Sequence, residues 1–362
     1  MLYEPRAHEP LTDEPWDAER VRDAIRAIAA ETETAFDDGW PGHPLDEAED
    51  RLRTIYLGGA GVVDALRRLG ERGLVDVRRD YVPYLERSVD APPDFPEDDP
   101  RRSFWTGETG IRLVLQRLAP SAENLDALAG LISGNARDER RELMWGSPGT
   151  MLVARELGFD DLWAESADWL RGQRDADGLW VQNLYGEPRR FLGPAHGFAG
   201  CVLALGHDPL AAGVAQKFAV ERDGLANWPA LADGELVGRD GVIRTQWCHG
   251  APGMIASLAG LLDEDLALAG GELVWRAGPL VKGANLCHGT AGNGYAFLSL
   301  FVRTDDERWL ARARAFAMHA LAQVEDARSR YGHGRHTLWT GDLGTALYLA
   351  DCLEGEGALP LP

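Results

Sequence analysis

Two short stretches of the sequence repeat the pattern Cys-His-Gly-x-x-Gly. The first begins at Cys248 and the second at Cys287, so each cysteine is followed directly by a histidine, His249 or His288. Cysteine thiolates and imidazole nitrogens are ligands that zinc prefers, in tetrahedral geometry. Two such pairs in one chain therefore predict a zinc site, provided that the fold brings them together.

The evident ligand set is Cys248, Cys287 and His288. A structural zinc site is normally closed by four protein ligands, whereas three ligands leave a position open for water or substrate. From the residues alone, His249 or His196 could supply a fourth ligand, so both kinds of site stay open at this point. The chain has only 4 cysteines in 362 residues, which is not the pattern of a disulfide-stabilised protein.

The two copies belong to a longer series, because Gly-x-x-Gly recurs along the chain. The first glycines of the copies are Gly58, Gly107, Gly146, Gly197, Gly250, Gly289 and Gly341. A spacing of about 40–50 residues is typical of proteins built from helix-pair repeats. A single Gly-x-x-Gly is typical of close helix packing, but residues at equal offsets from these glycines should occupy equivalent places in neighbouring repeats.

An apolar run follows each motif at once and predicts an inner helix. After the sixth copy, apolar residues cover all sides of the segment from Tyr295 to Val302, which predicts a buried helix. The next stretch, 305–330, places apolar residues from Trp309 to Val324 at steps of three and four between charges. This pattern predicts an amphipathic outer helix.

Other segments predict interruptions of the repeats. Turn residues between apolar pairs in 178–186, 235–243 and 272–283 predict short β-like insertions. The Pro- and Asp-rich segment 90–102 predicts an exposed loop. No shift in composition marks a domain boundary, so we expect a single domain over residues 1–362. Periodicity alone does not decide between an open solenoid and a closed ring.

Composition and charge narrow the class of protein. Hydrophobic residues make up 45 % and charged residues 26 % of the chain, as expected of a globular protein. The 58 acidic and 37 basic residues give a formal charge of −21, which disfavours nucleic acid and anionic membrane surfaces as partners. The N-terminus lacks the features of a signal peptide, and no apolar run is long enough for a membrane span. We therefore expect a cytoplasmic protein.

The motifs, in their order, resemble the lanthionine synthetase C-like (LanC-like) family, particularly its stand-alone members that bind glutathione. The most specific stretches are the fifth, sixth and fourth, QWCHGAPG, LCHGTAGNGYAFL and GPAHGFAG, and the resemblance covers nearly the whole chain. It implies an all-α fold, a closed α/α toroid of seven inner and seven outer helices, with zinc on Cys248, Cys287 and His288.

The resemblance also implies thiol chemistry. Cyclases of the family add a peptide cysteine thiolate to dehydroalanine or dehydrobutyrine and form a thioether, and stand-alone members resemble enzymes that add glutathione to dehydroamino acids. We therefore expect Zn²⁺, a thiol (glutathione or a peptide cysteine) and a peptide or protein with a dehydroamino acid. A non-catalytic sensor or scaffold that binds zinc and glutathione is the alternative. An α/α-toroid glycosidase needs two facing carboxylates, for which Asp342 and Glu108 are available, but it leaves the Cys-His pairs unexplained.

Three further residues are expected to serve the reaction. His196 has the same offset as His249 and His288 and matches the family's Ala-His-Gly histidine, so we expect it to donate the proton that the enolate needs. Glu142 stands where cyclases carry an aspartate and is expected to orient His196. Arg244 stands where peptide cyclases carry an active-site arginine and is expected to polarise the acceptor carbonyl.

Two basic residues are expected to bind the thiol substrate. Lys282 is one of only two lysines in the chain and resembles a lysine that contacts glutathione in stand-alone members. Arg335 is predicted to contribute to the same binding site. His249 stands where many cyclases have tyrosine and stand-alone members have histidine, which argues against peptide cyclisation. We expect its side chain to face the open site rather than the metal.

Overall fold

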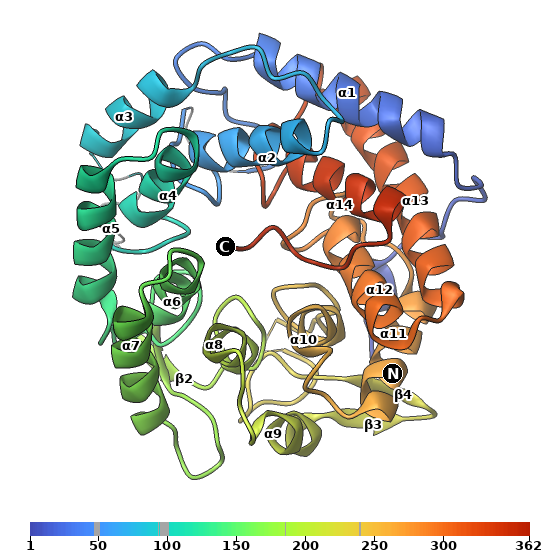
Figure 1. The fold of residues 1–362 in the computed structure, drawn as a ribbon. Helices are drawn as coiled ribbons and strands as arrows, with labels where there is room; N and C mark the ends of the chain where they lie inside the picture. Colours follow the sequence, from blue (N-terminus) through green and yellow to red (C-terminus); the bar gives the residue numbers. More distant parts are fainter. Residues whose placement is uncertain (47–50, 93, 95–100, 185, 239) are drawn as a thin grey trace.

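The computed structural model describes residues 1–46, 51–92, 94, 101–184, 186–238 and 240–362. Its helices form a ring of two concentric layers, and inner and outer helices alternate along the chain (Figure 1). The inner helices are α2 (Gly59–Glu71), α4 (Glu108–Leu118), α6 (Ser147–Glu156), α8 (Phe198–Leu205), α10 (Ala251–Leu258), α12 (Thr290–Thr304) and α14 (Asp342–Glu354). The outer helices are α1 (Ala18–Thr34), α3 (Val82–Asp90), α5 (Ala122–Asn135), α7 (Asp160–Gly172), α9 (Ala211–Phe218), α11 (Glu264–Ala277) and α13 (Glu307–Tyr331).

Each inner helix begins directly after the first glycine of a motif, which is its N-cap residue. The second glycine is required by a close approach of the backbone. At Gly292, for example, a Cβ would collide with the carbonyl oxygen of Leu286, six residues earlier, and the other six motifs repeat this contact. Since α1 packs against α14, the predicted repeats close into a toroid, and the predicted fold class is confirmed.

The loops before the inner helices are joined by backbone hydrogen bonds. Residues two positions before the first glycine pair with their counterparts in neighbouring repeats. Tyr56 N donates to Trp105 O at 2.9 Å, Cys248 N to Cys287 O at 3.1 Å, and Cys287 N to Trp339 O at 3.0 Å. Residues at equal offsets therefore do lie side by side, as the repeat alignment predicts.

The sixth repeat follows its predicted helix pair, apart from one turn. In α13 the residues from Trp309 to Val324 that were expected to face inward are buried. In α12 the residues from Tyr295 to Leu300 are buried, but Val302 is 63 % exposed. The prediction of burial up to Val302 is therefore wrong, because α12 ends at the surface where the chain turns into α13.

Short strands interrupt the repeats, but only partly where expected. Strand β1 (Gln182–Leu184) pairs with β2 (Glu187–Arg189), so 178–186 does contain a strand. A second hairpin joins β3 (Val220–Arg222) to β4 (Leu225–Asn227). The segment 235–243 forms only an isolated bridge between Val237 and Ile243.

The prediction for 272–283 is wrong for most of its length. Residues up to Ala277 belong to α11, and beyond it Leu280 forms an isolated bridge with His8. The reason is that Leu273 and Val274 continue the buried face of a long amphipathic helix, which outweighs the turn residues that follow.

The predicted exposed loop at 90–102 falls in part on 93 and 95–100, which lie outside the described residues. Within the described part, the side chain of Asp94 is only 1 % exposed. It accepts hydrogen bonds from the amides of Arg53 at 2.7 Å and Thr54 at 2.9 Å. The expectation of exposure is therefore wrong for Asp94, because its carboxylate satisfies the loop that leads into α2.

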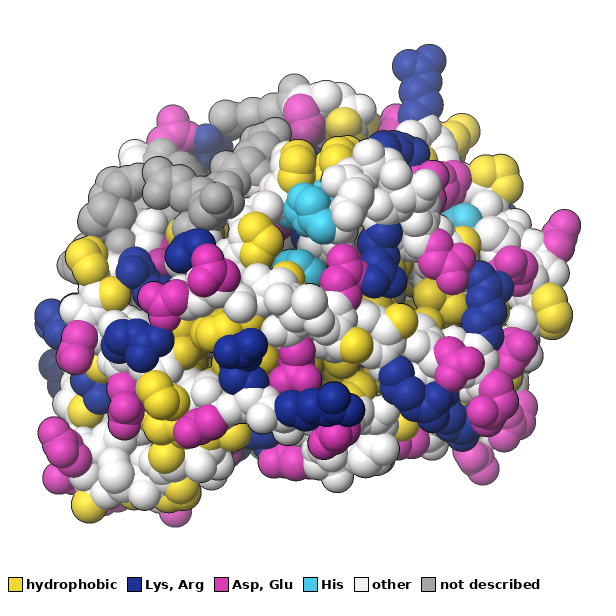
Figure 2. Space-filling view, turned by 90° about the horizontal axis from the view of Figure 1, so that it is seen from above, with side chains coloured by type: hydrophobic (Ala, Val, Ile, Leu, Met, Phe, Trp, Pro, Cys, Tyr) yellow, Lys and Arg dark blue, Asp and Glu magenta, His cyan; other side chains and the backbone are white. Residues whose placement is uncertain are grey.

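Acidic and basic side chains are interspersed on the face shown in Figure 2. One carboxylate is buried among cations, since Asp64 forms ion pairs with Arg67, Arg68 and Arg117. Burial alone would raise the pKa of Asp64, but the three guanidinium groups lower it well below its usual value. None of the described helices combines the length and hydropathy of a membrane span.

Candidate metal and thiol site

The two Cys-His pairs meet at the N-terminal ends of α10 and α12. The backbone bond from Cys248 to Cys287 places the cysteines side by side, and their side chains are buried. Each sulfur also accepts a side-chain hydrogen bond, Cys248 Sγ from Gln246 Nε2 at 2.8 Å and Cys287 Sγ from Tyr56 Oη at 3.0 Å. The structure thus brings both predicted sulfur ligands together.

The interaction between the two thiols separates their ionisation. It lowers the pKa of Cys248 to about 7, and together with burial it raises the pKa of Cys287 well above the usual value. The pair therefore releases one proton near neutrality and holds the second tightly. A bound cation would favour release of the second proton, since metal coordination deprotonates thiols. Burial raises the pKa of Tyr56, so its hydroxyl is a neutral donor.

His288 supplies a neutral imidazole beside the sulfurs. Burial lowers its pKa to about 4. The neutral imidazole is the form that binds metals. In the described side-chain arrangement, the donor atoms of Cys248, Cys287 and His288 do not all lie within 4.8 Å of one another, so metal binding requires a rearrangement of these side chains. Two adjacent thiols and an imidazole on the next residue are nevertheless a donor set that fits zinc.

His196, in the loop before α8, forms a hydrogen-bonded pair with Glu142, in the loop before α6. His196 Nδ1 lies 2.9 Å from Glu142 Oε2, and the Trp145 ring stacks on the imidazole at 5.3 Å. The Glu142 side chain is fully buried and accepts hydrogen bonds from the amides of Met144 at 2.9 Å, Trp145 at 2.6 Å and Gly146 at 3.0 Å. Glu142 is therefore fixed by the loop before α6, and Nδ1 of His196 is the nitrogen that faces it.

His249 lies beside His196 and not with the two sulfurs. The centroids of the two imidazole rings are 6.3 Å apart, and Phe191 contacts both rings. Burial lowers the pKa of His249 to about 3. Its Nδ1 is buried and has no hydrogen-bond partner among the described residues. The structure thus places His249 next to His196, and its exposure to an open site stays a prediction.

Lys282 and Arg335 line one cavity of about 550 Å³ together with His288 and Gln246. Lys282 Nζ lies 3.4 Å from Gln246 Oε1, so it is one residue removed from the Cys248 sulfur. The Arg335 side chain is buried and pairs with Asp46, with Nε at 2.8 Å from Oδ1. The structure therefore brings both predicted substrate-binding residues to the predicted metal ligand His288.

The N-terminal segment forms one wall of this cavity. Glu9 N donates to Pro279 O at 3.0 Å and Val281 N to Ala7 O at 3.1 Å, so the segment runs along the loop that carries Lys282. Glu9 itself lines the cavity. Its carboxylate is held by His319 Nε2 at 2.8 Å.

Arg244 lies next to this site but binds a partner of its own. Arg244 Nη2 lies 2.6 Å from Asp240 Oδ2 in the loop before Cys248. It lines a second cavity, of about 660 Å³, which shares Gln246 and Lys282 with the first. The structure thus places Arg244 at the edge of the site, with its guanidinium directed to Asp240.

The two carboxylates that a glycosidase would need are both engaged elsewhere. Glu108 pairs with Arg101 at 2.9 Å and with Arg112 at 2.6 Å. Asp342 accepts a hydrogen bond from the Arg335 amide at 3.0 Å. Both carboxylates hold the ends of their own inner helices, which gives the glycosidase alternative no support.

Three contacts of the site were missed by the sequence reasoning. They are the Tyr56 and Gln246 donors to the sulfurs and the Trp145 ring on His196. The repeat alignment held a signal for two of them. Tyr56 has the same offset from its glycine as Cys248 and Cys287, and Trp145 has the same offset as His196. Considering every repeat at these offsets would have found both.

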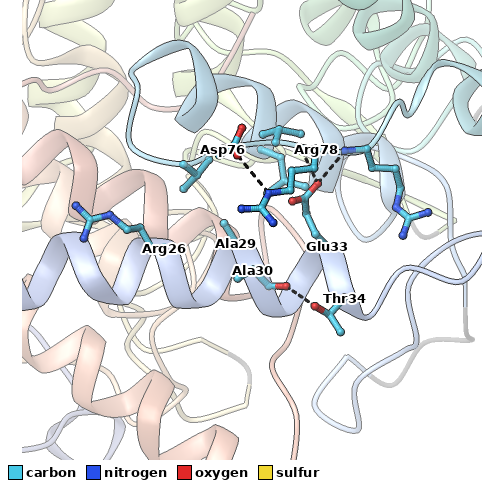
Figure 3. Close-up of a pocket in the computed structure, with 11 residues that line it drawn as sticks. Arg26, Ala29, Ala30, Glu33, Thr34, Asp76 and Arg78 are labelled. Atoms are coloured by element: carbon cyan, nitrogen blue, oxygen red, sulfur yellow. Dashed lines mark hydrogen bonds and ion pairs between the residues drawn. The ribbon is translucent and has the colours of Figure 1, made fainter.

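A cavity of about 760 Å³ lies apart from all these residues (Figure 3). It is lined by α1 and the segment that precedes α3. There, Arg78 Nε lies 3.2 Å from Asp76 Oδ2 and the Arg78 amide donates to Glu33 at 3.1 Å. None of the predicted site residues lines it, so cavity volume alone does not identify the site.

Two known proteins are similar in sequence to this chain. The chain is 35 % identical over 195 residues to glutathione S-transferase LANCL1 of Danio rerio and 37 % identical over 146 residues to LanC-like protein GCL1 of Arabidopsis thaliana. These matches cover 48 % and 36 % of this chain but only 44 % and 32 % of the relatives, so the chain spans less than half of either relative.

The solved structure of nisin cyclase shares the fold. It superposes with a TM-score of 0.53 at 16 % identity, over 93 % of this chain and 100 % of the cyclase chain. The family model described as lanthionine synthetase C-like protein matches residues 52–361. The chain therefore belongs to the lanthionine synthetase C-like family.

Proposed function

We propose that the protein is an enzyme that uses zinc on Cys248, Cys287 and His288 to activate a thiol, and adds this thiol to dehydroalanine or dehydrobutyrine. The observation that carries the proposal is the pair of buried cysteines, joined by a backbone hydrogen bond, at the N-terminal ends of two neighbouring inner helices. Membership of the family supports it, since one relative is named a glutathione S-transferase and the protein with the shared fold is a cyclase.

Zinc, when bound, would keep a substrate thiol deprotonated at neutral pH and hold it beside the electrophile. Three protein ligands suit this task, because they leave one coordination position for the substrate. The four cysteines are free, and a reducing compartment such as the cytoplasm would keep the adjacent thiols reduced.

His196 is proposed as the general acid. Addition forms a C–S bond at the β-carbon and moves the alkene electrons toward the α-carbon and its carbonyl as an enolate, which takes up one proton. Glu142 faces Nδ1 of His196, so the proton would leave from Nε2. The buried carboxylate orients the ring and stabilises its cationic form. Arg244 would polarise the acceptor carbonyl after exchanging Asp240 for the substrate.

We propose glutathione as the thiol, because the cavity beside His288 contains Lys282, a cation suited to a carboxylate, and Arg335, which would exchange Asp46 for the second carboxylate. Its volume of about 550 Å³ is in the range of small-molecule sites. His249, which lies beside His196, would contact the electrophile. A peptide cysteine would use the same sulfur site but needs neither cation.

The alternative from the sequence is a non-catalytic protein that binds zinc and glutathione. It uses the same cysteines and the same cavity, but it leaves the buried His196–Glu142 pair without a role. The two functions differ in one measurable result, the formation of a thioether.

The test is incubation of a dehydroalanine peptide with glutathione and enzyme, followed by mass spectrometry. We expect the peptide to gain the mass of one glutathione faster than it does without enzyme. His196→Ala should abolish this acceleration. Cys287→Ala should lose the zinc found in the wild type. Cys201→Ala is the matched control for zinc content, because the thiol of this buried cysteine donates to the Arg141 carbonyl, away from Cys248 and Cys287. Zinc retained in Cys287→Ala, or no gain above background, would contradict the proposal.

A further inference from the structure

Each of the paired cysteine sulfurs accepts a hydrogen bond from one neutral side chain. Tyr56 Oη donates to Cys287 Sγ at 3.0 Å, and Gln246 Nε2 donates to Cys248 Sγ at 2.8 Å. Tyr56 comes from the first repeat and Cys287 from the sixth, so the contact spans the seventh repeat that lies between them in the ring. The Tyr56 backbone is fixed by its bond to Trp105 O. The reaction proposed above uses neither donor.

A site that makes thiolates for addition to an alkene has a problem of selectivity. With zinc bound, its own cysteine sulfurs would be thiolates as well, and they would lie beside the substrate sulfur that the alkene must reach. If Cys287 Sγ attacked the β-carbon, a C–S bond would form and the alkene electrons would take up a proton at the α-carbon. The product is a covalent adduct that removes a metal ligand.

Hydrogen bonds to a thiolate reduce its reactivity, because the donor withdraws electron density from sulfur and must be displaced before sulfur bonds to carbon. Gln246 also lies 3.4 Å from Lys282 Nζ, which keeps its amide oxygen toward the lysine and its NH₂ group toward Cys248. Both donors are therefore held in place by contacts outside the sulfur pair.

We infer that Tyr56 and Gln246 are positioning residues that shield Cys287 and Cys248 from alkylation, so that the substrate sulfur is the one that adds to the alkene. The inference rests on the proposed function, since it assumes that both cysteines are thiolates at a metal site. It assigns one donor to each sulfur, and removal of a donor should affect its own cysteine.

The test measures alkylation of each cysteine in the zinc-loaded protein. The probes are iodoacetamide and methyl 2-acetamidoacrylate, a small dehydroalanine derivative, and the modified cysteine is located by peptide mass spectrometry. We expect Tyr56→Phe to speed modification of Cys287 about 10-fold, with little change at Cys248. Gln246→Leu should reverse the pattern. Tyr348→Phe is the matched control, since this buried hydroxyl donates to the Ala313 carbonyl at 2.6 Å.

The selectivity between the two sulfurs separates shielding from a merely structural role. General loosening of the site would expose both cysteines in either variant. Equal rates at Cys287 in the wild type and Tyr56→Phe, at equal zinc content and unfolding temperature, would overturn the inference alone. A wild type that binds no zinc on purification or reconstitution would contradict the proposed function and this inference with it.

Discussion

The replacement Glu142→Gln tests how the buried carboxylate serves His196. Glu142 Oε1 accepts the amides of Trp145 and Gly146, and Oε2 accepts the Met144 amide and faces His196 Nδ1. A glutamine can keep its oxygen at the first position. Its NH₂ group then faces the Met144 amide, a donor against a donor.

The magnitude follows from this geometry. One buried amide loses its acceptor, which costs about 1–3 kcal/mol of unfolding free energy. Natural domains have about 5–15 kcal/mol, so the variant should still fold. The glutamine would donate to Nδ1 of His196 and force the proton onto Nε2, without the negative charge that stabilises the imidazolium. Since general acids contribute about 10²–10⁴-fold to rates, we expect a loss of about 100-fold or more in kcat.

The assay is the rate of glutathione addition to a dehydroalanine peptide, with urea unfolding measured in parallel. Adding Glu142→Gln to His196→Ala should cost little further activity, because the two residues act as one unit. A folded Glu142→Gln variant with the wild-type rate would refute the reasoning. Independent, multiplicative losses in the double variant would refute the pairing.

Three further predictions concern the frame of the site. Asp64→Asn leaves three half-buried guanidinium groups without this carboxylate and should cost about 1–3 kcal/mol in urea unfolding. Because these cations hold the pKa of Asp64 below its usual value, the wild-type advantage should be full above about pH 4 and shrink as the pH falls; an advantage independent of pH would contradict this. Burial raises the pKa of Asp342 to about 6, so the folded state keeps a proton that the unfolded state releases. Its contribution to stability should fall by roughly 2 kcal/mol from pH 4 to pH 6, and Asp342→Asn should flatten that part of the stability profile measured by denaturation. Gly253→Ala places a Cβ against the Trp247 carbonyl and should unfold the loop that carries the proposed zinc ligand Cys248, whereas Gly213→Ala, whose Cβ would meet nothing within 4 Å, should bind zinc normally; equal zinc content in both variants would count against the close-approach argument.

Much of the fold follows from the repeat of the glycines. The first glycine of each motif caps an inner helix, and the second sits where the chain crosses its own backbone, so both features appear at fixed spacing in the sequence. The same spacing gives Cys248 and Cys287 equal offsets from their glycines. The backbone hydrogen bonds between loops explain why residues at equal offsets are neighbours in space. Closure of the ring could not be read from periodicity, because it depends on how α1 packs against α14.

Side-chain partners were less predictable. The contact between Tyr56 and Cys287 joins residues 231 positions apart, and no local pattern encodes it. The partners of Arg244 and Arg335 could not be predicted from the sequence either, because a charged side chain pairs with whichever carboxylate the fold places nearby. The prediction of a β-like insertion at 272–283 was wrong because helix packing of Leu273 and Val274 outweighed the local turn residues.

The central claim is that the paired Cys-His motifs form one zinc site for thiol addition. The most direct measurement is the rate of glutathione addition to a dehydroalanine peptide by the purified protein, before zinc removal by a chelator, after removal, and after return of one equivalent. The account predicts that the rate above background is lost with the metal and restored with it. A rate that is unchanged by removal of zinc would contradict it.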